Sequence, residues 1–572
     1  MSQMYFFKFL FGEPSPDMAI MDEVQERSFV PLSFELTRQT EIFFEEKLYP
    51  QAFNLLLNVV GSGTISSNEV VVPQPEHLAI AATMLVHPNT TTGAELDAEK
   101  EAPNIALRLL RLTHALIGSK NAHFHSAFNF THFESTRQGT RRDSPAPGET
   151  ILNDKNSLWA TAEDFWHAVG WAFNCSVSHP ARWKHWQIWL QFICTVLEDD
   201  WNERESEFLG AQQRELAERS EREASQGVEP TEQGTRETRR FRKGNNKEDG
   251  LGIIRESLIF KYIASNITTY GRDRRIMRAI FADGQPKSAQ FSEVFKNELR
   301  KSETKQRSSN SKKRSKVVNV DKGEYGDYQS DSDDEYITFS GRISRKISPP
   351  AKATKARPTK RTRRGTRNVM DRNAESDTEM LDADHANDLS SLGGYNSLAL
   401  RQRLLGLLSS VSTRLPKDFV PVDDLYHMFA ENIRDLSLPI FQHFITPSNL
   451  PGLTMEAHCG LCELLLYLMR ESSAPPSNDD YLTSTKLQQC FLPYGAASPT
   501  IANNAKISML LEAMITILHH ENAISATPQL KNAAQAGIAH RESASLERGT
   551  VEWSYLWESG VRIKFMLDHI LP

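Results

Sequence analysis

The chain of 572 residues is 39% hydrophobic and 24% charged, with a formal net charge of −7. Its hydrophobic share lies below the roughly 45–50% of average globular proteins, an average that also counts glycine, so we expect folded parts mixed with polar segments. An acidic total charge gives no support to a protein whose whole surface binds nucleic acid.

Cysteine content and hydropathy bear on the compartment. The five cysteines are few, odd in number and mostly within apolar stretches, which favours a reducing, intracellular compartment over a disulfide framework. The apolar start, Met4–Phe11, is too short to span a bilayer, and we expect residues 1–30 to be a flexible N-terminal segment. No other stretch reaches about 18 uninterrupted apolar residues, so we expect no membrane contact.

Apolar residues at three- and four-residue spacing predict helices through much of the chain. The pattern runs over residues 34–60, 78–86 and 105–117, and we expect Pro50 to divide the first of these into two helices. Helix after helix with short loops predicts an all-α fold, built as a bundle or an α-solenoid. We therefore expect residues 31–201 to form a first helical block.

Seven of the nine tryptophans lie between residues 158 and 201. Their spacing places Trp166 on one helix and Trp183 and Trp186 on a second, with Pro180 between them. Each ring can bury roughly 150–250 Å², so we favour the core of a helical hairpin. The alternative is an exposed aromatic groove for a partner peptide, formed by the same three tryptophans.

Charged residues dominate the next segment, after which helical spacing returns. Residues 202–250 are rich in Glu, Arg, Gln, Ser and Gly. We expect a charged insertion there, with a solvated helix to about Ala224 and disorder after it. Residues 251–300 have the pattern of two amphipathic helices, too few to bury a core alone, so we expect this pair to dock on the first block.

Residues 301–392 combine sparse apolar side chains with no hydrophobic period, which predicts a disordered acidic and basic linker. Between Tyr336 and Met370 there are eleven Lys or Arg and no acidic residue. The densest part is typical of a nuclear import signal, of a phosphate-binding arm for DNA or RNA, or of a solvating charge run. Its basic residues are Lys352, Lys355, Arg357, Lys360, Arg361, Arg363, Arg364 and Arg367.

Serines followed by acidic residues flank this basic tract on both sides. Ser330 and Ser332 lie in the acidic run that ends at Glu335, and Ser376 repeats the pattern downstream. Acid-directed kinases recognise such sites, so we expect the three serines to be phosphorylated. A merely solvated acidic run is the alternative, and Tyr336–Phe339 could also add as a strand to a partner's sheet edge.

Helical spacing resumes after the linker, so we expect residues 393–572 to form a second helical block. Within it, Cys459 and Cys462 form a Cys-x-x-Cys, but a zinc site needs four ligands and no second paired motif occurs. We therefore expect two small buried thiols. Four further residues with ligand chemistry lie among the tryptophans and are also expected to be structural: His167, Cys175, His179 and His185. We expect no metal, no cofactor and no catalytic site, since no known motif is present.

These features favour a non-catalytic nuclear scaffold or adaptor subunit of a chromatin- or transcription-related assembly. Its expected partners are proteins of a nuclear complex and an import receptor, with non-specific contact to DNA or RNA as an addition. The alternative is a chromatin or transcription protein that binds nucleic acid through residues 352–367. An enzyme with an unfamiliar site is a third class, which no motif supports.

Overall fold

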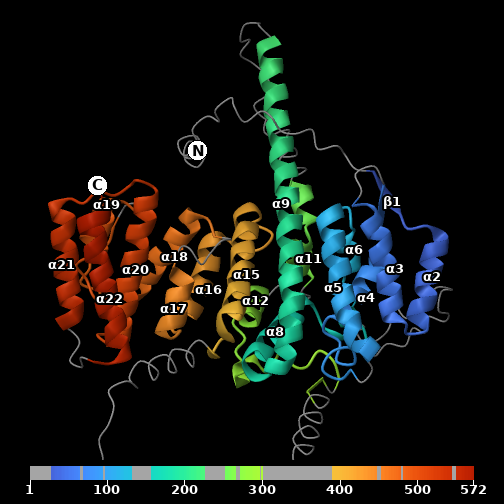
Figure 1. Ribbon diagram of the computed structural model, residues 1–572. Helices are drawn as coiled ribbons and strands as arrows, with labels where there is room; N and C mark the ends of the chain where they lie inside the picture. The colour runs from blue at the N-terminus through green and yellow to red at the C-terminus, as the bar shows by residue number, and fades with distance from the viewer. Residues whose placement is uncertain are drawn as a thin grey trace, which may run out of the picture. The chain divides into compact units, whose positions relative to one another are not determined.

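The computed structural model describes residues 28–571, except for 65–68, 95–96, 132–155, 226–250, 266–270, 297, 300–389, 447–452, 478–480 and 544–548. Helices dominate these residues (Figure 1), so the all-α expectation is confirmed in this coarse form. One departure is a parallel pair of three-residue strands, β1 (Phe29–Pro31) and β2 (Val70–Val72), in which Phe29 lies opposite Val70. The helical spacing did not predict these strands.

Apolar spacing predicted four of the first six described helices, while the start of the fourth and the two short helices after it were not predicted. These six helices are α2 (Phe34–Glu45), α3 (Tyr49–Ser62), α4 (Pro75–Met84), α5 (Asp97–Ile117), α6 (Phe124–Ala127) and α7 (Leu158–Thr161). Pro50 lies in the first turn of α3, where its missing N–H breaks no helical hydrogen bond. The expected division of this segment into two helices is therefore confirmed, and α5 packs along both α3 and α4.

The tryptophan-rich segment folds as two helices, α8 (Phe165–Ser178) and α9 (Pro180–Ser225), and the second begins at Pro180. Asp164 caps α8 by accepting a hydrogen bond from the His167 backbone N–H at 2.7 Å. The two helices pack against each other. The charged second half of α9 extends past its neighbours, as Figure 1 shows.

Two short helices, α11 (Leu258–Ala264) and α12 (Arg272–Ile280), follow and pack on α9 and α8. A 3-10 turn, η3 (Pro286–Ser288), leads into a segment that crosses α8 at Gly170. A Cβ atom at Gly170 would lie 2.3 Å from the Phe291 ring, so this close approach requires glycine.

Capping side chains begin several of the helices after residue 389. The helices of this region are α15 (Gly394–Arg414), α16 (Val422–Arg434), α17 (Leu438–Ile445), α18 (Met455–Met469), α19 (Ser484–Lys486), η6 (Leu487–Phe491), α20 (Ile501–His520), α21 (Pro528–Ser543), α22 (Val551–Phe565) and η7 (Met566–Ile570). Thr454, Thr500 and Thr550 each accept a hydrogen bond from a backbone N–H three residues later, which fixes the starts of α18, α20 and α22.

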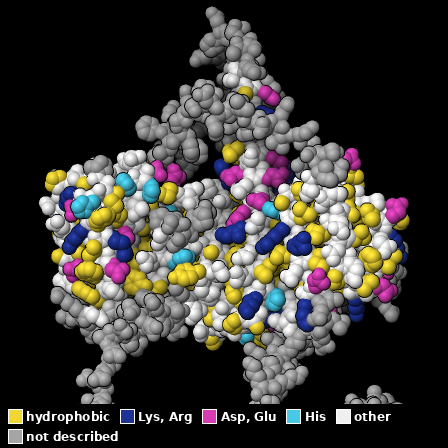
Figure 2. All heavy atoms as spheres, in the orientation of Figure 1, with side chains coloured by type: hydrophobic (Ala, Val, Ile, Leu, Met, Phe, Trp, Pro, Cys, Tyr) yellow, Lys and Arg dark blue, Asp and Glu magenta, His cyan; other side chains and the backbone are white. Residues whose placement is uncertain are grey.

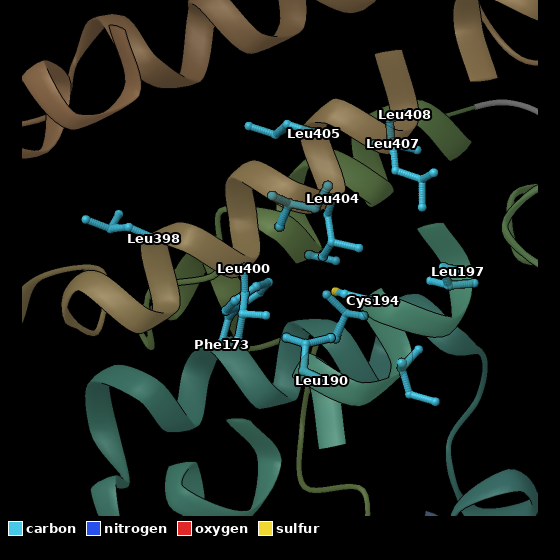
Figure 3. Close-up of a cluster of buried hydrophobic side chains, with 14 of the residues drawn as sticks. Phe173, Leu190, Cys194, Leu197, Leu398, Leu400, Leu404, Leu405, Leu407 and Leu408 are labelled. Carbon is cyan, nitrogen blue, oxygen red and sulfur yellow. The ribbon is translucent and has the colours of Figure 1, made fainter. Parts of the chain in front are cut away.

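The expected division into two separate helical blocks is not confirmed. The described residues on both sides of 300–389 belong to one compact unit, and α15 packs against α8, α9 and α12. Figure 3 shows Leu400 and Leu404 of α15 directed toward Phe173 of α8 and Cys194 of α9. Beside this apolar contact, the Arg403 guanidinium of α15 pairs with a carboxylate of α9 at 2.6 Å. Side chains far apart in sequence therefore share one core.

Candidate interaction surface

The basic tract and the three candidate serines lie outside the described residues. Residues 352–367, Ser330, Ser332 and Ser376 all fall within 300–389. Their roles in import, nucleic-acid contact and phosphorylation stay predictions.

The three tryptophans of the alternative groove lie inside the helical unit. Trp166 and Trp186 are fully buried, and Trp183 is 8% exposed. The Trp166 indole N–H donates to the Tyr262 backbone carbonyl at 3.1 Å, so its polar atom is satisfied within the core. A partner peptide could reach these rings only if the surrounding helices separated.

A buried carboxylate, that of Glu298, lies among the tryptophan rings. Its Oε1 accepts hydrogen bonds from the Arg182 guanidinium at 2.6 Å and from the Trp186 indole at 2.8 Å. Its Oε2 accepts from the Trp171 indole at 3.1 Å and from the Phe295 backbone N–H at 3.3 Å. The carboxylate thus joins α8 and α9 to the segment that follows η3.

Arg182, the cation that pairs with Glu298, also has hydrogen-bond partners for its other donors. The side chains of Arg182 and Glu298 are 1% and 0% exposed. Beyond the carboxylate, the Arg182 guanidinium donates to the Thr91 hydroxyl at 2.7 Å and to the Val86 carbonyl. Because the charges are matched and the polar atoms satisfied, this pair fixes packing and leaves no free acid or base for chemistry.

A second buried arginine, Arg401 of α15, has backbone carbonyls as its main partners. Its guanidinium donates to the Ala282 carbonyl at 2.8 Å and to the Ile280 carbonyl, and lies 4.1 Å from the centre of the Phe173 ring. Burial lowers the pKa of Arg401 to about 9, which still leaves it charged at neutral pH. Neither Arg401 nor the Arg182–Glu298 pair was recognised from sequence, where a charged residue is usually assigned to the surface.

The Cys-x-x-Cys lies on α18 with its thiols held in the protonated form. Burial raises the pKa of the half-buried Cys459 to about 11 and raises that of the fully buried Cys462 further. Metal binding and nucleophilic attack both need the thiolate, which is scarce here at neutral pH. The neighbouring His458 is engaged with the Ile445 carbonyl at 2.8 Å.

The other residues with ligand chemistry also lie within the packed helices. Burial lowers the pKa of His167 and of His185, the latter to about 4, and raises the pKa of the Cys175 thiol. His179 packs against the Trp171 ring. Within the described part of the chain, no group of three or more His, Cys, Asp or Glu side chains could hold a metal ion.

One of the described helices, α20, is long and apolar enough to cross a membrane by length and composition alone. However, 72% of that stretch is buried inside the helical unit, as in the core helix of a folded protein. Lys506 and Glu512 also interrupt it, and the Lys506 ammonium donates to the Arg434 carbonyl at 2.7 Å.

An exposed apolar row on α22, formed by Trp557, Val561 and Phe565, is the candidate interaction surface, and we call it the α22 stripe. These side chains are 53%, 42% and 56% exposed. Their four-residue spacing places them along one side of the helix over about 12 Å. Leu556 and Ile563 are buried, and the helix packs against α20 and α21. Helix α22 therefore has one apolar side in the core and a second one facing solvent.

Four charged side chains lie on or beside the α22 stripe: Glu558, Arg562, the exposed Lys564 and Asp568. Arg562 pairs with Glu512 of α20 at 2.6 Å, and Asp568 pairs with Lys531 of α21 at 3.1 Å. Figure 2 shows hydrophobic side chains interspersed with charged side chains and histidines over this part of the molecule. A partner that covers the apolar row would therefore also contact charged side chains.

The sequence does contain a signal for the α22 stripe. A row of apolar residues at positions 557, 561 and 565 lies beside a second row that includes Leu556 and Ile563. A helix in one wall of a folded unit needs only one apolar face, so two such rows indicate a helix covered on both sides.

No protein family model, curated protein or solved structure matches this chain. Function is therefore inferred from the chain's own surface and sequence.

Proposed function

We propose that this protein is a non-catalytic helical scaffold or adaptor that holds a partner protein on the α22 stripe and works in a nuclear, chromatin- or transcription-related assembly. The α22 stripe is the observation that carries the proposal. Large apolar side chains left half exposed in one row are typical of a surface that a partner covers, since water contact with them is unfavourable.

The size and shape of the α22 stripe favour one amphipathic helix of a partner protein. A half-exposed Trp or Phe leaves roughly 100 Å² open to solvent. The α22 stripe therefore offers far less than the about 800 Å² per partner of a standard protein–protein interface, so it fits a short segment of a partner better than a broad symmetric contact with a second copy of this chain. A single row fits one helix with apolar residues three and four positions apart.

The nuclear part of the proposal is supported by sequence alone. Lys352–Arg367 has the composition of an import signal, and the composition of residues 301–392 supports a charged tether. Arg401 donates to the carbonyls of Ala282 and Leu392, two described residues on opposite sides of residues 300–389.

A photo-crosslinking amino acid in place of Val561 or Phe565 tests the proposed surface in the full chain. We expect adducts with a partner segment that has apolar residues at helical spacing. Phe34 of α2, which is 80% exposed, is the matched control position and should give no such adduct. Absence of adducts at both α22 positions, or adducts only with a second copy of this chain, would contradict the proposal.

A variant in which the basic residues of Lys352–Arg367 are neutralised distinguishes the scaffold proposal from the second candidate, a nucleic-acid-binding protein. The scaffold proposal expects the variant to leave the nucleus while it still binds its partner at α22. If instead the unmodified chain binds DNA with affinity that falls steeply with salt, and the variant loses this binding, the second candidate is favoured.

A further inference from the structure

A shallow groove of about 490 Å³ runs between α3 and α5, and we call it the α3–α5 groove. Its lining consists of Leu57, Asn58, Gly61, Arg108, Arg111 and Leu112. Gly61 keeps it open, because only the Leu112 side chain, at 4.0 Å, lies near the place of the missing Cβ atom. The groove therefore has an apolar floor with room above it.

The charge of the α3–α5 groove is positive and uncompensated. Arg108 and Arg111 are exposed, one turn apart on α5, and neither forms an ion pair with a described residue. Helix α3 has no acidic or basic residue, and α5 has no acidic residue after Glu101. Two like charges at this spacing repel each other, and an anion between them would relieve that repulsion.

We propose that the α3–α5 groove binds an acidic peptide segment of a partner protein. Guanidinium groups present paired N–H donors that match a carboxylate or a phosphate, so Arg108 and Arg111 would hold the anionic side chains. An apolar side chain of the same peptide would cover Leu57 and Leu112. The exposed Asn58 amide adds a donor and an acceptor for the peptide backbone.

A peptide fits the groove better than a nucleic acid does. Nucleic-acid affinity comes mainly from many phosphate contacts spread along a basic surface. The groove offers two cations above apolar side chains, and the α3 wall adds only uncharged residues. A segment that alternates acidic and apolar residues complements both parts.

Selection from a random peptide library, with the full chain as bait, tests this proposal without knowledge of the natural partner. We expect the selected peptides to be rich in Asp and Glu next to Leu or Phe. Fluorescence anisotropy of a labelled selected peptide should then show binding about tenfold weaker, or more, for Arg108→Gln and for Arg111→Gln, since each removes a charge-assisted contact. Binding by the unmodified chain should also weaken at high salt.

Two further variants distinguish the groove from general charge effects. Gly61→Leu should fill the groove and abolish binding, while Arg38→Gln, which removes an exposed arginine on α2, should leave binding unchanged. Circular dichroism of each variant would check that its helices are kept. The proposal would be overturned if the selected peptides had no excess of Asp and Glu. It would also be overturned if the Arg108→Gln and Arg111→Gln variants bound the peptide as tightly as the unmodified chain does. Variants of the α22 stripe should bind the peptide normally, so this proposal and the proposed function can fail separately.

Discussion

Replacement of Glu298 by Gln is the sharpest test of what holds the helical unit together. The change keeps the size of the side chain but removes the charge that faces Arg182 and replaces one oxygen by an NH2 group. In place of Oε1, the new NH2 group meets the Arg182 guanidinium and the Trp186 indole N–H. In place of Oε2, it meets the Trp171 indole N–H and the Phe295 backbone N–H. A donor would therefore face a donor in a place that water does not reach.

The expected cost follows from burial. Removal of one partner from a buried ion pair costs about 3–5 kcal/mol, because the other charge stays buried without compensation. An exposed pair contributes only about 0–1 kcal/mol. Glu207 forms such a pair with Lys120, where the side chains are 39% and 42% exposed, so Glu207→Gln is a matched control.

Urea unfolding of the full chain, followed by tryptophan fluorescence, measures both variants. Seven tryptophans lie within residues 158–201, so the signal reports on the packing around Glu298. We expect the unfolding free energy to fall by several kcal/mol for Glu298→Gln and by less than about 1 kcal/mol for Glu207→Gln. Equal losses would show that the buried pair does not stabilise the packing of α8 and α9 as we infer.

Three other changes test separate parts of the fold. Gly170→Ala should lower the free energy of unfolding, measured by thermal unfolding, by about 1–3 kcal/mol, because the added methyl group would lie 2.3 Å from the Phe291 ring. The control Gly210→Ala, on the solvated part of α9, should leave this free energy unchanged or raise it. Arg401→Gln should lower the free energy of unfolding by about 2 kcal/mol or more, because the backbone carbonyls of Ile280 and Ala282 lose their buried donor. An unchanged melting temperature would contradict this. Burial lowers the pKa of His77 from 6.5 to about 4, so the unfolded chain takes up a proton between these pH values while the folded chain does not. Stability should therefore fall as the pH drops from 6.5 toward 4, by about 2 kcal/mol at pH 5, and His77→Gln should flatten this part of the urea-unfolding profile.

Local features of the fold could be predicted from sequence because they depend on neighbouring residues. Apolar spacing predicted the helices, and Pro50 and Pro180 were expected to separate pairs of helices, as they do. Tryptophans at helical spacing predicted aromatic helices, and the rings of Trp166 and Trp186 are buried. Each of these inferences needs only a short window of sequence.

Features that depend on distant residues could not be predicted in this way. Arg182 and Glu298 are 116 positions apart, and a single sequence gives no reason to pair them. The expectation of two helical blocks came from the polar composition of residues 301–392, which indicates where burial stops but not which helices meet across it. The strands β1 and β2 were missed because three residues are too few for a two-residue period to be recognised.

The two buried arginines bear on how the segment between residues 300 and 389 can act. Arg182 holds Glu298, just before the segment, against Trp171 of α8, and Arg401, just after it, lies on Phe173 of the same helix. Described residues on both sides of the segment, Glu298 and Arg401, therefore contact one helix, α8, through buried charged side chains. If the predicted phosphorylation or import-receptor binding takes place within the segment, we expect the helices that carry the α22 stripe and the α3–α5 groove to keep their packing, because these buried contacts lie outside it.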